Sequence, residues 1–257
     1  MRNGNSRYAY STLKTDRYLR RFYRDWAQTK DLYVAHMVAK ETDLEILTNK
    51  KLDKNFVMEK INAYRWEIER YIDKDRRFLT SLKPIVVELT APAIVKAMAA
   101  EAKKANVGPM ATVAGAIAQF LGEDLLKKGY RDVIIENGGD LFIKATKTRL
   151  VGLYAGRSKA WNKLKLKIKP LDTPLGICTS SGTIGHSLSF GNADSVVIIS
   201  KDACLSDAVA TATANRVDSK DDVEQAMVFA RSIRGVSGAV IIIKDKLASW
   251  GKIEFAR

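Results

Sequence analysis

The sequence has no apolar run near the roughly 18 residues that a membrane-spanning helix needs, which argues against an integral membrane protein. Its basic N-terminus also lacks the continuous apolar segment of a secretory signal. Only two cysteines occur, Cys178 and Cys204, which is too few for a disulfide scaffold and favours a reducing compartment. Together these absences predict a cytoplasmic protein that does not enter a membrane.

No internal repeat and no low-complexity linker divides the 257 residues. That length supports one large domain with a substantial core. The first residues are the exception, because they are basic and interspersed with tyrosines. We therefore predict a basic N-terminal arm over residues 1–30 and a single domain over residues 31–257.

Periodicity gives the order of the elements. Alternating and apolar runs predict strands over residues 32–38, 44–47, 132–136, 140–144, 151–155, 164–168, 195–200, 239–243 and 252–255. Helical spacing predicts helices over residues 52–71, 92–104, 109–128, 206–216 and 221–232. Because the two types do not alternate strictly, the pattern favours an α+β fold with mixed sheets and packed helices over a doubly wound sheet.

Positive charge is concentrated in two segments. Residues 1–24 contain seven Lys or Arg and one acid, and residues 144–169 contain nine and no acid, against a net charge of +14 for the chain. Such segments suit an anionic partner, either a small molecule or a nucleic acid. The alternative for the second segment is an edge strand protected by lysines, because Lys163–Lys169 alternates Lys with Leu or Ile.

The string Asn137, Gly138, Gly139, Asp140 predicts a tight turn between two strands. Glycines allow backbone conformations and close approaches that let amide groups face a phosphate. Asn-Gly is also a common hairpin turn that binds no ligand, so the sequence leaves both interpretations possible, a phosphate-binding turn and a plain hairpin.

A polar stretch further along combines a thiol, hydroxyls and glycines with one of the two histidines. Its members are Cys178, Thr179, Ser180, Ser181 and Gly182, followed by His186. A thiolate needs a nearby base or positive charge, which His186 and the preceding lysine-rich strand would supply. The alternative is that Cys178 is buried and inert. We expect His36, within an apolar strand, to be a core histidine.

Two helix starts are further candidates. Gly108 and Pro109 open a helix whose first turn has no acid, and such ends attract phosphate or carboxylate. Asp207 and Thr211 share a helix face, where a carboxylate and a hydroxyl suit a hard cation. The alternatives are an ordinary buried helix end and a carboxylate that only favours the positive helix terminus beside Ser206.

In their order, these motifs resemble the ApbE flavin transferase superfamily, whose fold is related to the T-fold. The resemblance covers residues 106–216 and includes Glu136–Asp140, the segment from Ser181 to His186, and the helix start Ser206–Ala212. It implies that Asp207 and Thr211 bind magnesium and that FAD or FMN is a ligand. In the helix predicted over residues 109–128, this chain has Ala114 and Gln119 where the transferases carry Lys and Asp. The loss of both charges argues against flavin phosphoryl transfer as the activity.

The strings Val107–Ala118 and Gly176–Gly191 are similar to a smaller branch of that superfamily, linked to sulfide-dependent homocysteine formation in methanogens. This resemblance implies a component of sulfur assimilation. It would help transfer sulfide-derived sulfur to an aspartate-semialdehyde-type precursor, with an iron–sulfur or sulfur-carrier partner protein.

Three hypotheses follow. In the first, Cys178 handles sulfur, His186 is its base, Ser181 assists, and the basic segment holds an anionic small-molecule substrate. In the second, the chain binds a flavin nucleotide with magnesium and has weak or no FMN transferase activity. The third is nucleic-acid binding through the basic segments. The small-residue helix and the apolar-and-lysine strand also predict a homodimer.

Overall fold

The computed structural model describes residues 31–153, 161, 164–181 and 191–256. The predicted basic arm, Gly182 and His186 therefore lie outside the described residues. Within the described part of the chain, no helix is long and apolar enough to cross a bilayer.

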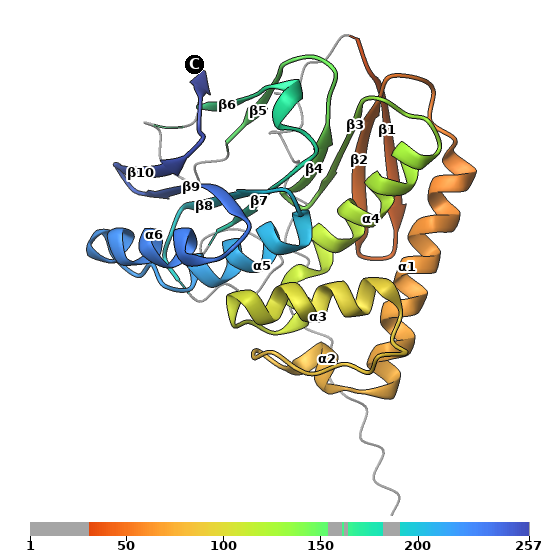
Figure 1. Ribbon diagram of the computed structural model, residues 1–257, viewed down its shortest axis with the longest axis horizontal. Coiled ribbons are helices and arrows are strands. Elements are labelled where there is room, and N and C mark those ends of the chain that lie inside the picture. Colours follow the sequence, from red (N-terminus) through yellow and green to blue (C-terminus); the bar gives the residue numbers. More distant parts are fainter. Residues whose placement is uncertain (1–30, 154–160, 162–163, 182–190, 257) are drawn as a thin grey trace, which may run out of the picture.

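Eight strands form one antiparallel sheet in the order β1-β2-β3-β4-β7-β8-β9-β10 (Figure 1). The strands are β1 (Tyr33–Ala39), β2 (Thr42–Thr48), β3 (Val133–Asn137), β4 (Asp140–Lys144), β7 (Leu175–Ser180), β8 (Ser195–Ser200), β9 (Val236–Ile243) and β10 (Lys246–Gly251). Strands far apart in the sequence become neighbours, because β4 pairs with β7 and β2 pairs with β3.

A second sheet has three strands in the order β11 (Phe255–Ala256), β6 (Lys165–Ile168) and β5 (Arg149–Gly152). Leu166 and Ile168 of β6 are buried in one apolar cluster with Ile177, Val197 and Val240 of the large sheet. The small sheet thus covers one face of the large sheet.

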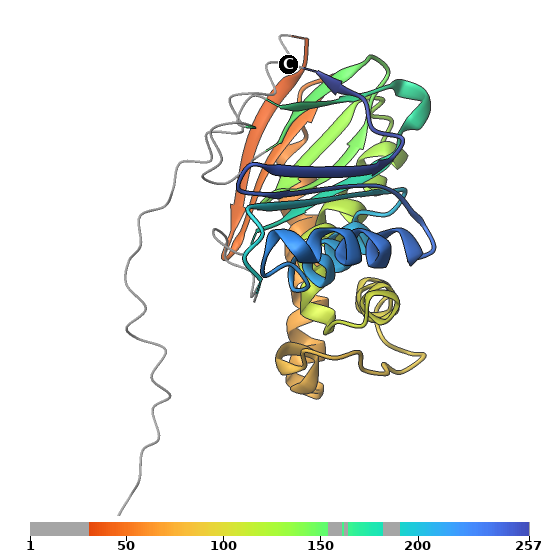
Figure 2. The same cartoon turned by 90° about the vertical axis from the view of Figure 1, so that its left-hand side faces the viewer.

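Helices cover the other face (Figures 1 and 2). They are α1 (Lys54–Lys74), α2 (Arg77–Thr80), α3 (Ala93–Ala105), α4 (Val113–Lys127), α5 (Ala203–Ala214) and α6 (Val223–Ser232), with the short 3-10 helix η2 (Pro109–Thr112) before α4. Helix α3 buries Ile94, Val95, Met98 and Ala102, as its spacing predicts. The sheets with packed helices confirm the α+β prediction, but every described strand pair is antiparallel, so the sheets are not mixed.

Several element predictions were wrong. Residues 246–251, which the predicted strands leave out, form β10. Helix α5 begins at Ala203 and not at Ser206, because Asp202 is its N-cap and accepts from the amide of Leu205. Residues 175–180 of the polar stretch form β7, which pairs with β4 and β8 on both sides. His36 is not a core residue, because its side chain is 51% exposed and bonds Asp43 at 2.5 Å.

The basic segment largely pairs within the chain. Lys167 and Lys169 of the small sheet both contact the Glu254 carboxylate, each at 2.6 Å. Lys147 and Arg149 both contact Asp31. These pairs favour the structural reading of this segment over a nucleic-acid surface.

Candidate functional site

The double-glycine turn, the polar stretch and the aspartate-led helix meet at one end of the large sheet. Asp140, the first residue of β4, lies opposite Cys178 of β7 in the strand register. Gly139 lies against Thr179, since a Cβ atom at position 139 would be 3.7 Å from the Thr179 carbonyl oxygen. Asp207 of α5 is close enough for its charge to act on both Asp140 and Cys178. These three segments therefore lie close together in the described part of the chain.

The turn itself has the backbone conformation that requires glycine. Gly138 and Gly139 have φ angles of 69° and 106°, in the left-handed region that other residues rarely adopt. The Glu136 carboxylate accepts the Gly139 amide at 2.7 Å, and the Asn137 amide nitrogen donates to the Ala114 carbonyl at 3.2 Å. The turn is thereby fixed to the start of α4.

Helices α4 and α5 cap each other. Asp207 of α5 accepts the Gly115 amide of α4 at 2.9 Å, and Gln119 of α4 accepts the Ala203 amide of α5 at 2.9 Å. Gly115 makes the close contact possible, because a Cβ atom there would lie 2.3 Å from the Ala203 carbonyl oxygen. The two helix starts are therefore held in a fixed relation, and Asp207 with them. Gln119 stands where the transferases carry Asp, but its role as a cap depends on a residue 84 positions away and is not visible in the local sequence.

The carboxyl groups of Asp140 and Asp207 make this end of the sheet acidic, and we call their surroundings the acidic centre. Burial, followed by the charge of Asp207, raises the pKa of Asp140 well above its usual value. Burial likewise raises the pKa of Asp207 to about 7, although amide hydrogen bonds from Gly115 and Ala114 lower it. No salt bridge to either carboxyl occurs among the described residues. A proton or a bound cation would each relieve the repulsion between the two carboxyl groups.

Asp207 is the most accessible residue of helix α5. Every other residue of α5 is buried, Thr211 included, whereas Asp207 is partly exposed. Ser180 lies two residues beyond Cys178, on the same face of β7. Its hydroxyl oxygen is buried and has no hydrogen-bond partner in the described part of the chain. An orphaned buried oxygen is uncommon and marks a place where a ligand fits.

Comparison with known proteins agrees with this geometry. The family model described as AbpE bacteria matches residues 24–248. The chain belongs to this ApbE-like family.

Relatives of this ApbE-like chain occur in methanogenic archaea. UPF0280 protein MJ1526 of Methanocaldococcus jannaschii is 42% identical over 222 residues, covering 84% of this chain and 90% of the relative. A UPF0280 protein of Methanospirillum hungatei is 41% identical over 218 residues, covering 85% of this chain and 87% of the relative.

Solved structures show the same fold. The ApbE protein of Thermotoga maritima has a TM-score of 0.59 at 14% identity, covering 87% of this chain and 96% of that chain. The flavin transferase ApbE from Vibrio cholerae has a TM-score of 0.56 at 13% identity, covering 85% and 97%. Identity this low establishes the shared fold and not a shared activity.

The surroundings of Cys178 favour the neutral thiol. Its side chain is fully buried, and its sulfur donates to the Ala203 carbonyl at 3.2 Å. Burial raises the pKa of Cys178 well above its usual value, and the charges of Asp140 and Asp207 raise it further. The described surroundings therefore give no support for a thiolate. The base predicted for it, His186, lies outside the described residues, and Ser181 follows directly after β7.

Gly108 and Pro109 have a packing role in the ApbE-like fold. A Cβ atom at position 108 would lie 1.7 Å from the Ser81 carbonyl oxygen, and Pro109 is buried at the start of η2. The anion next to the α4 amides is the chain's own Asp207. The predicted anion site at this helix start thus already has an occupant within the chain.

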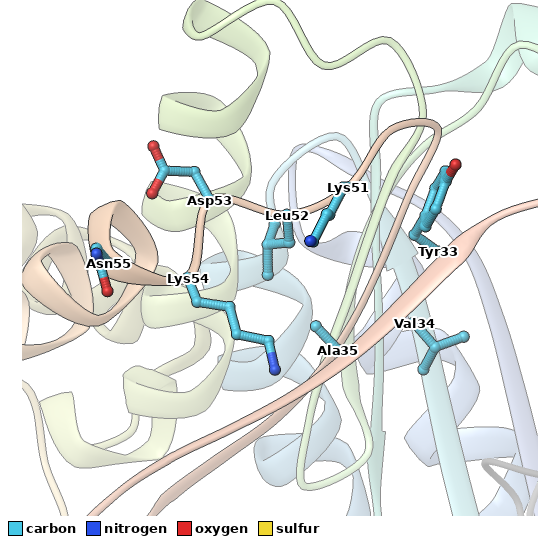
Figure 3. Close-up of a pocket in the computed structure, with 8 residues that line it drawn as sticks. All are labelled: Tyr33, Val34, Ala35, Lys51, Leu52, Asp53, Lys54 and Asn55. Carbon is cyan, nitrogen blue, oxygen red and sulfur yellow. The ribbon is translucent and has the colours of Figure 1, made fainter.

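A groove of about 750 Å³ lies beside the start of β1 and the segment that leads into α1 (Figure 3). It is lined by Tyr33, Val34, Ala35, Lys51, Leu52, Asp53, Lys54 and Asn55, and none of these was a predicted site residue. Among the described residues, no group of three or more His, Cys, Asp or Glu side chains is arranged to hold a metal ion. A cation at the acidic centre would therefore also need hydroxyl, carbonyl or ligand oxygens.

The raised pKa of Asp207 predicts a pH dependence of stability. The folded state holds a proton up to about pH 7, whereas the unfolded carboxyl loses it near pH 4. The folded state binds more protons in this window, so the free energy of unfolding falls as pH rises from about 4 to 7. Asp207→Asn should make this slope shallower in urea unfolding with EDTA present. An unchanged slope in the variant would show that Asp207 does not titrate in this range.

Proposed function

We propose that this protein binds a flavin nucleotide through a divalent cation, magnesium, at the acidic centre, with weak or no FMN transferase activity. The observation that carries the proposal is the pair of carboxyl groups, Asp140 and Asp207, whose charges act on each other while no cationic side chain in the described part of the chain pairs with either. Carboxylate and hydroxyl oxygens are the ligands that magnesium prefers.

The donor set fits such an ion. Asp207 supplies a carboxylate, Thr211 supplies a hydroxyl one helical turn later on α5, and Asp140 supplies a second carboxylate whose pKa the charge of Asp207 raises. Magnesium keeps few protein ligands and completes its shell with water and phosphate oxygens. An acidic centre therefore attracts a phosphate only when the cation is present.

A flavin nucleotide is favoured by the fold and the turn. The solved relatives include proteins described as flavin transferases, and this likeness supports flavin as the class of ligand. Gly138 is exposed at the turn with open space around its Cα, so a ligand can approach the backbone there. The bound cation would supply charge stabilisation for the phosphates, while the chain's own residues orient the nucleotide.

The two charged side chains that the transferases carry in the helix before the turn are absent from this chain. Ala114 has no titratable group, and Gln119 is engaged with Ala203 and with Glu123 at 2.8 Å. Neither residue can hold or move a proton during transfer. We therefore expect this protein to bind the flavin nucleotide but to transfer FMN weakly or not at all.

The test is a titration of FAD and FMN by flavin fluorescence or calorimetry, with magnesium and with EDTA. We expect saturable binding in magnesium and at least tenfold weaker binding in EDTA. Riboflavin, which has no phosphate, should bind equally with and without magnesium. Equal affinity for FAD in magnesium and in EDTA would overturn the proposal.

Sulfur assimilation is the second candidate, and one observation favours it. The relatives occur in methanogenic archaea, the setting of the branch that the sequence resembles. The buried thiol of Cys178 gives it no support as the sulfur-handling group. The test is a reconstituted assay that follows homocysteine formation from sulfide. Full activity of Cys178→Ser in that assay would show that the protein takes part in the pathway without using the Cys178 thiol.

A further inference from the structure

Strand β1 is one edge of the large sheet, because among the described residues it pairs only with β2 (Figure 2). Proteins usually protect such an edge with lysine, proline or a β-bulge, since its open backbone groups otherwise pair with another strand. None of these devices occurs in β1, whose sequence is YVAHMVA and whose register with β2 is regular. On a chain of net charge +14, an edge without a single Lys or Arg is a surface suited to strand pairing.

The register of the β1–β2 hairpin shows which backbone groups of this edge are open. A two-residue turn joins the two strands, so Ala39 and Thr42 form the closing hydrogen-bonded pair. Along an antiparallel pair, hydrogen-bonded and non-hydrogen-bonded residue pairs alternate. The amides and carbonyls of Val34, His36 and Val38 therefore point away from β2, toward the open edge.

The side chains of the same three residues lie on the face of the sheet turned away from the helices. Ala35 and Met37 are buried in the cluster with the helices, and alternate residues of a strand point to opposite faces. Val34 is 61% exposed, Val38 is 49% exposed, and the side chain of His36 is 51% exposed. Exposure this high shows that the described part of the chain leaves the edge uncovered.

We infer that two copies of this chain pair through β1, antiparallel and about a two-fold axis at His36, to form a homodimer. The axis sets His36 opposite His36 of the second copy, and Val34 opposite Val38 of the second copy. These are the residues whose backbone groups are open, so each facing pair is a hydrogen-bonded pair. Every open amide and carbonyl of the three residues thereby finds a partner, and the two large sheets become one.

The groove of Figure 3 fits this occupant. It is lined by three consecutive residues of β1, which are Tyr33, Val34 and Ala35. Because side chains alternate along a strand, a groove that follows three consecutive residues runs along the backbone edge and suits an extended strand. In the two-fold register, this groove receives the end of the second copy's β1, including its Val38 and Ala39.

The charges around the groove are complementary to a second copy. Lys51 and Lys54 line the groove, and neither forms a salt bridge within the described part of the chain. The turn that follows Ala39 of the second copy lies at the Tyr33 end of the groove and carries Glu41. The Glu41 side chain contacts Arg65 of its own copy but is still 83% exposed. An exposed carboxylate thus comes to the end of a groove that contains two lysines without an acidic partner.

The test is disulfide cross-linking of the full chain with cysteines placed on β1. Facing residues of a hydrogen-bonded pair have Cα atoms about 5.5 Å apart, which suits a disulfide. A variant that carries both Val34→Cys and Val38→Cys should therefore form a cross-linked dimer, at least tenfold more than either single variant. In a single variant the two added cysteines of the dimer lie about 14 Å apart along the strands, beyond disulfide reach. Cys178 and Cys204 are both buried and give a low background.

Sedimentation equilibrium of the unaltered chain is a second measurement that needs no substitution. We expect twice the chain mass of 28.6 kDa. Val34→Lys combined with Val38→Lys should return the mass to that of one chain, because each lysine would face a lysine of the second copy.

The inference concerns a surface apart from the acidic centre and does not rest on the proposed flavin binding. A monomeric unaltered chain, including one whose β1 edge is occupied by residues 1–30, would overturn it. So would a dimer whose double-cysteine variant cross-links no more than the single variants, or one that the two lysines leave intact.

Discussion

Asp207→Asn is expected to weaken magnesium-dependent flavin nucleotide binding by at least about tenfold, since even the loss of a group that only hydrogen-bonds to a metal ligand costs about 10–100-fold. Asparagine is the informative replacement because its oxygen can still accept the Gly115 amide, which Asp207 accepts at 2.9 Å. The cap on α4 is retained while the negative charge is lost. The measurement is the FAD titration in magnesium, with residual binding in EDTA as the baseline.

Asp202→Asn is the matched control for this variant. Asp202 lies five residues earlier and caps the start of the same helix through the Leu205 amide at 3.1 Å. Asparagine caps helices about as well as aspartate. The control should bind FAD like the unaltered protein. Equal loss in both variants would assign the effect to helix α5 as a whole and not to a cation at Asp207.

Arg149→Met should have the largest effect on stability, a loss of about 3–5 kcal/mol in the free energy of unfolding, as for other broken buried ion pairs. The guanidinium is 5% exposed and bonds Asp31 at 2.7 Å and Asp132 at 3.3 Å. Methionine keeps most of the apolar stem but leaves Asp132, itself 5% exposed as a residue, without its cation. Urea unfolding at pH 7 measures the loss.

Lys147→Met is the control, because Lys147 pairs with the same Asp31 but is 69% exposed. Exposed pairs contribute about 0–1 kcal/mol, so this variant should stay near the unaltered protein. A loss below about 1 kcal/mol in Arg149→Met would show that the buried pair does not hold β5 in place.

The pH dependence has a defined sign. Burial raises the pKa of Asp132, but hydrogen bonds from the Thr146 amide and hydroxyl and then from Arg149 outweigh it, so the net pKa lies below its usual value. A lowered pKa stabilises the fold above the unfolded pKa near 4, and this stability is lost as pH falls through the folded value. The difference between Arg149→Met and the unaltered protein should therefore shrink in acid.

Local signals in the sequence predicted the local structure well. The Asn137–Asp140 string predicts a hairpin that the structure contains, because the two glycines alone permit its backbone angles. The same holds for α3, whose four predicted inward residues are all buried. These features depend on residues close together in the chain.

Features that depend on distant residues were not predictable. Residues 246–251 were not predicted as a strand because the turn residues Asp245 and Gly251 bound this segment, but pairing with β9 makes them a strand. Gln119 accepts the Ala203 amide 84 residues away, and Asp207 accepts the Gly115 amide 92 residues away. No local sequence pattern indicates a cap between residues so far apart. The resemblance to the ApbE superfamily placed Asp207 at the site, whereas its electrostatics follow from burial beside Asp140.

The central claim is that a divalent cation at Asp207 connects this chain to a flavin phosphate. The most direct measurement is anomalous diffraction from a crystal grown with FAD and manganese as the stand-in for magnesium. We predict an anomalous peak about 2.1 Å from an Asp207 carboxylate oxygen, next to the phosphates of the flavin. FAD bound with no anomalous peak at Asp207, or with manganese only at other residues, would contradict the claim.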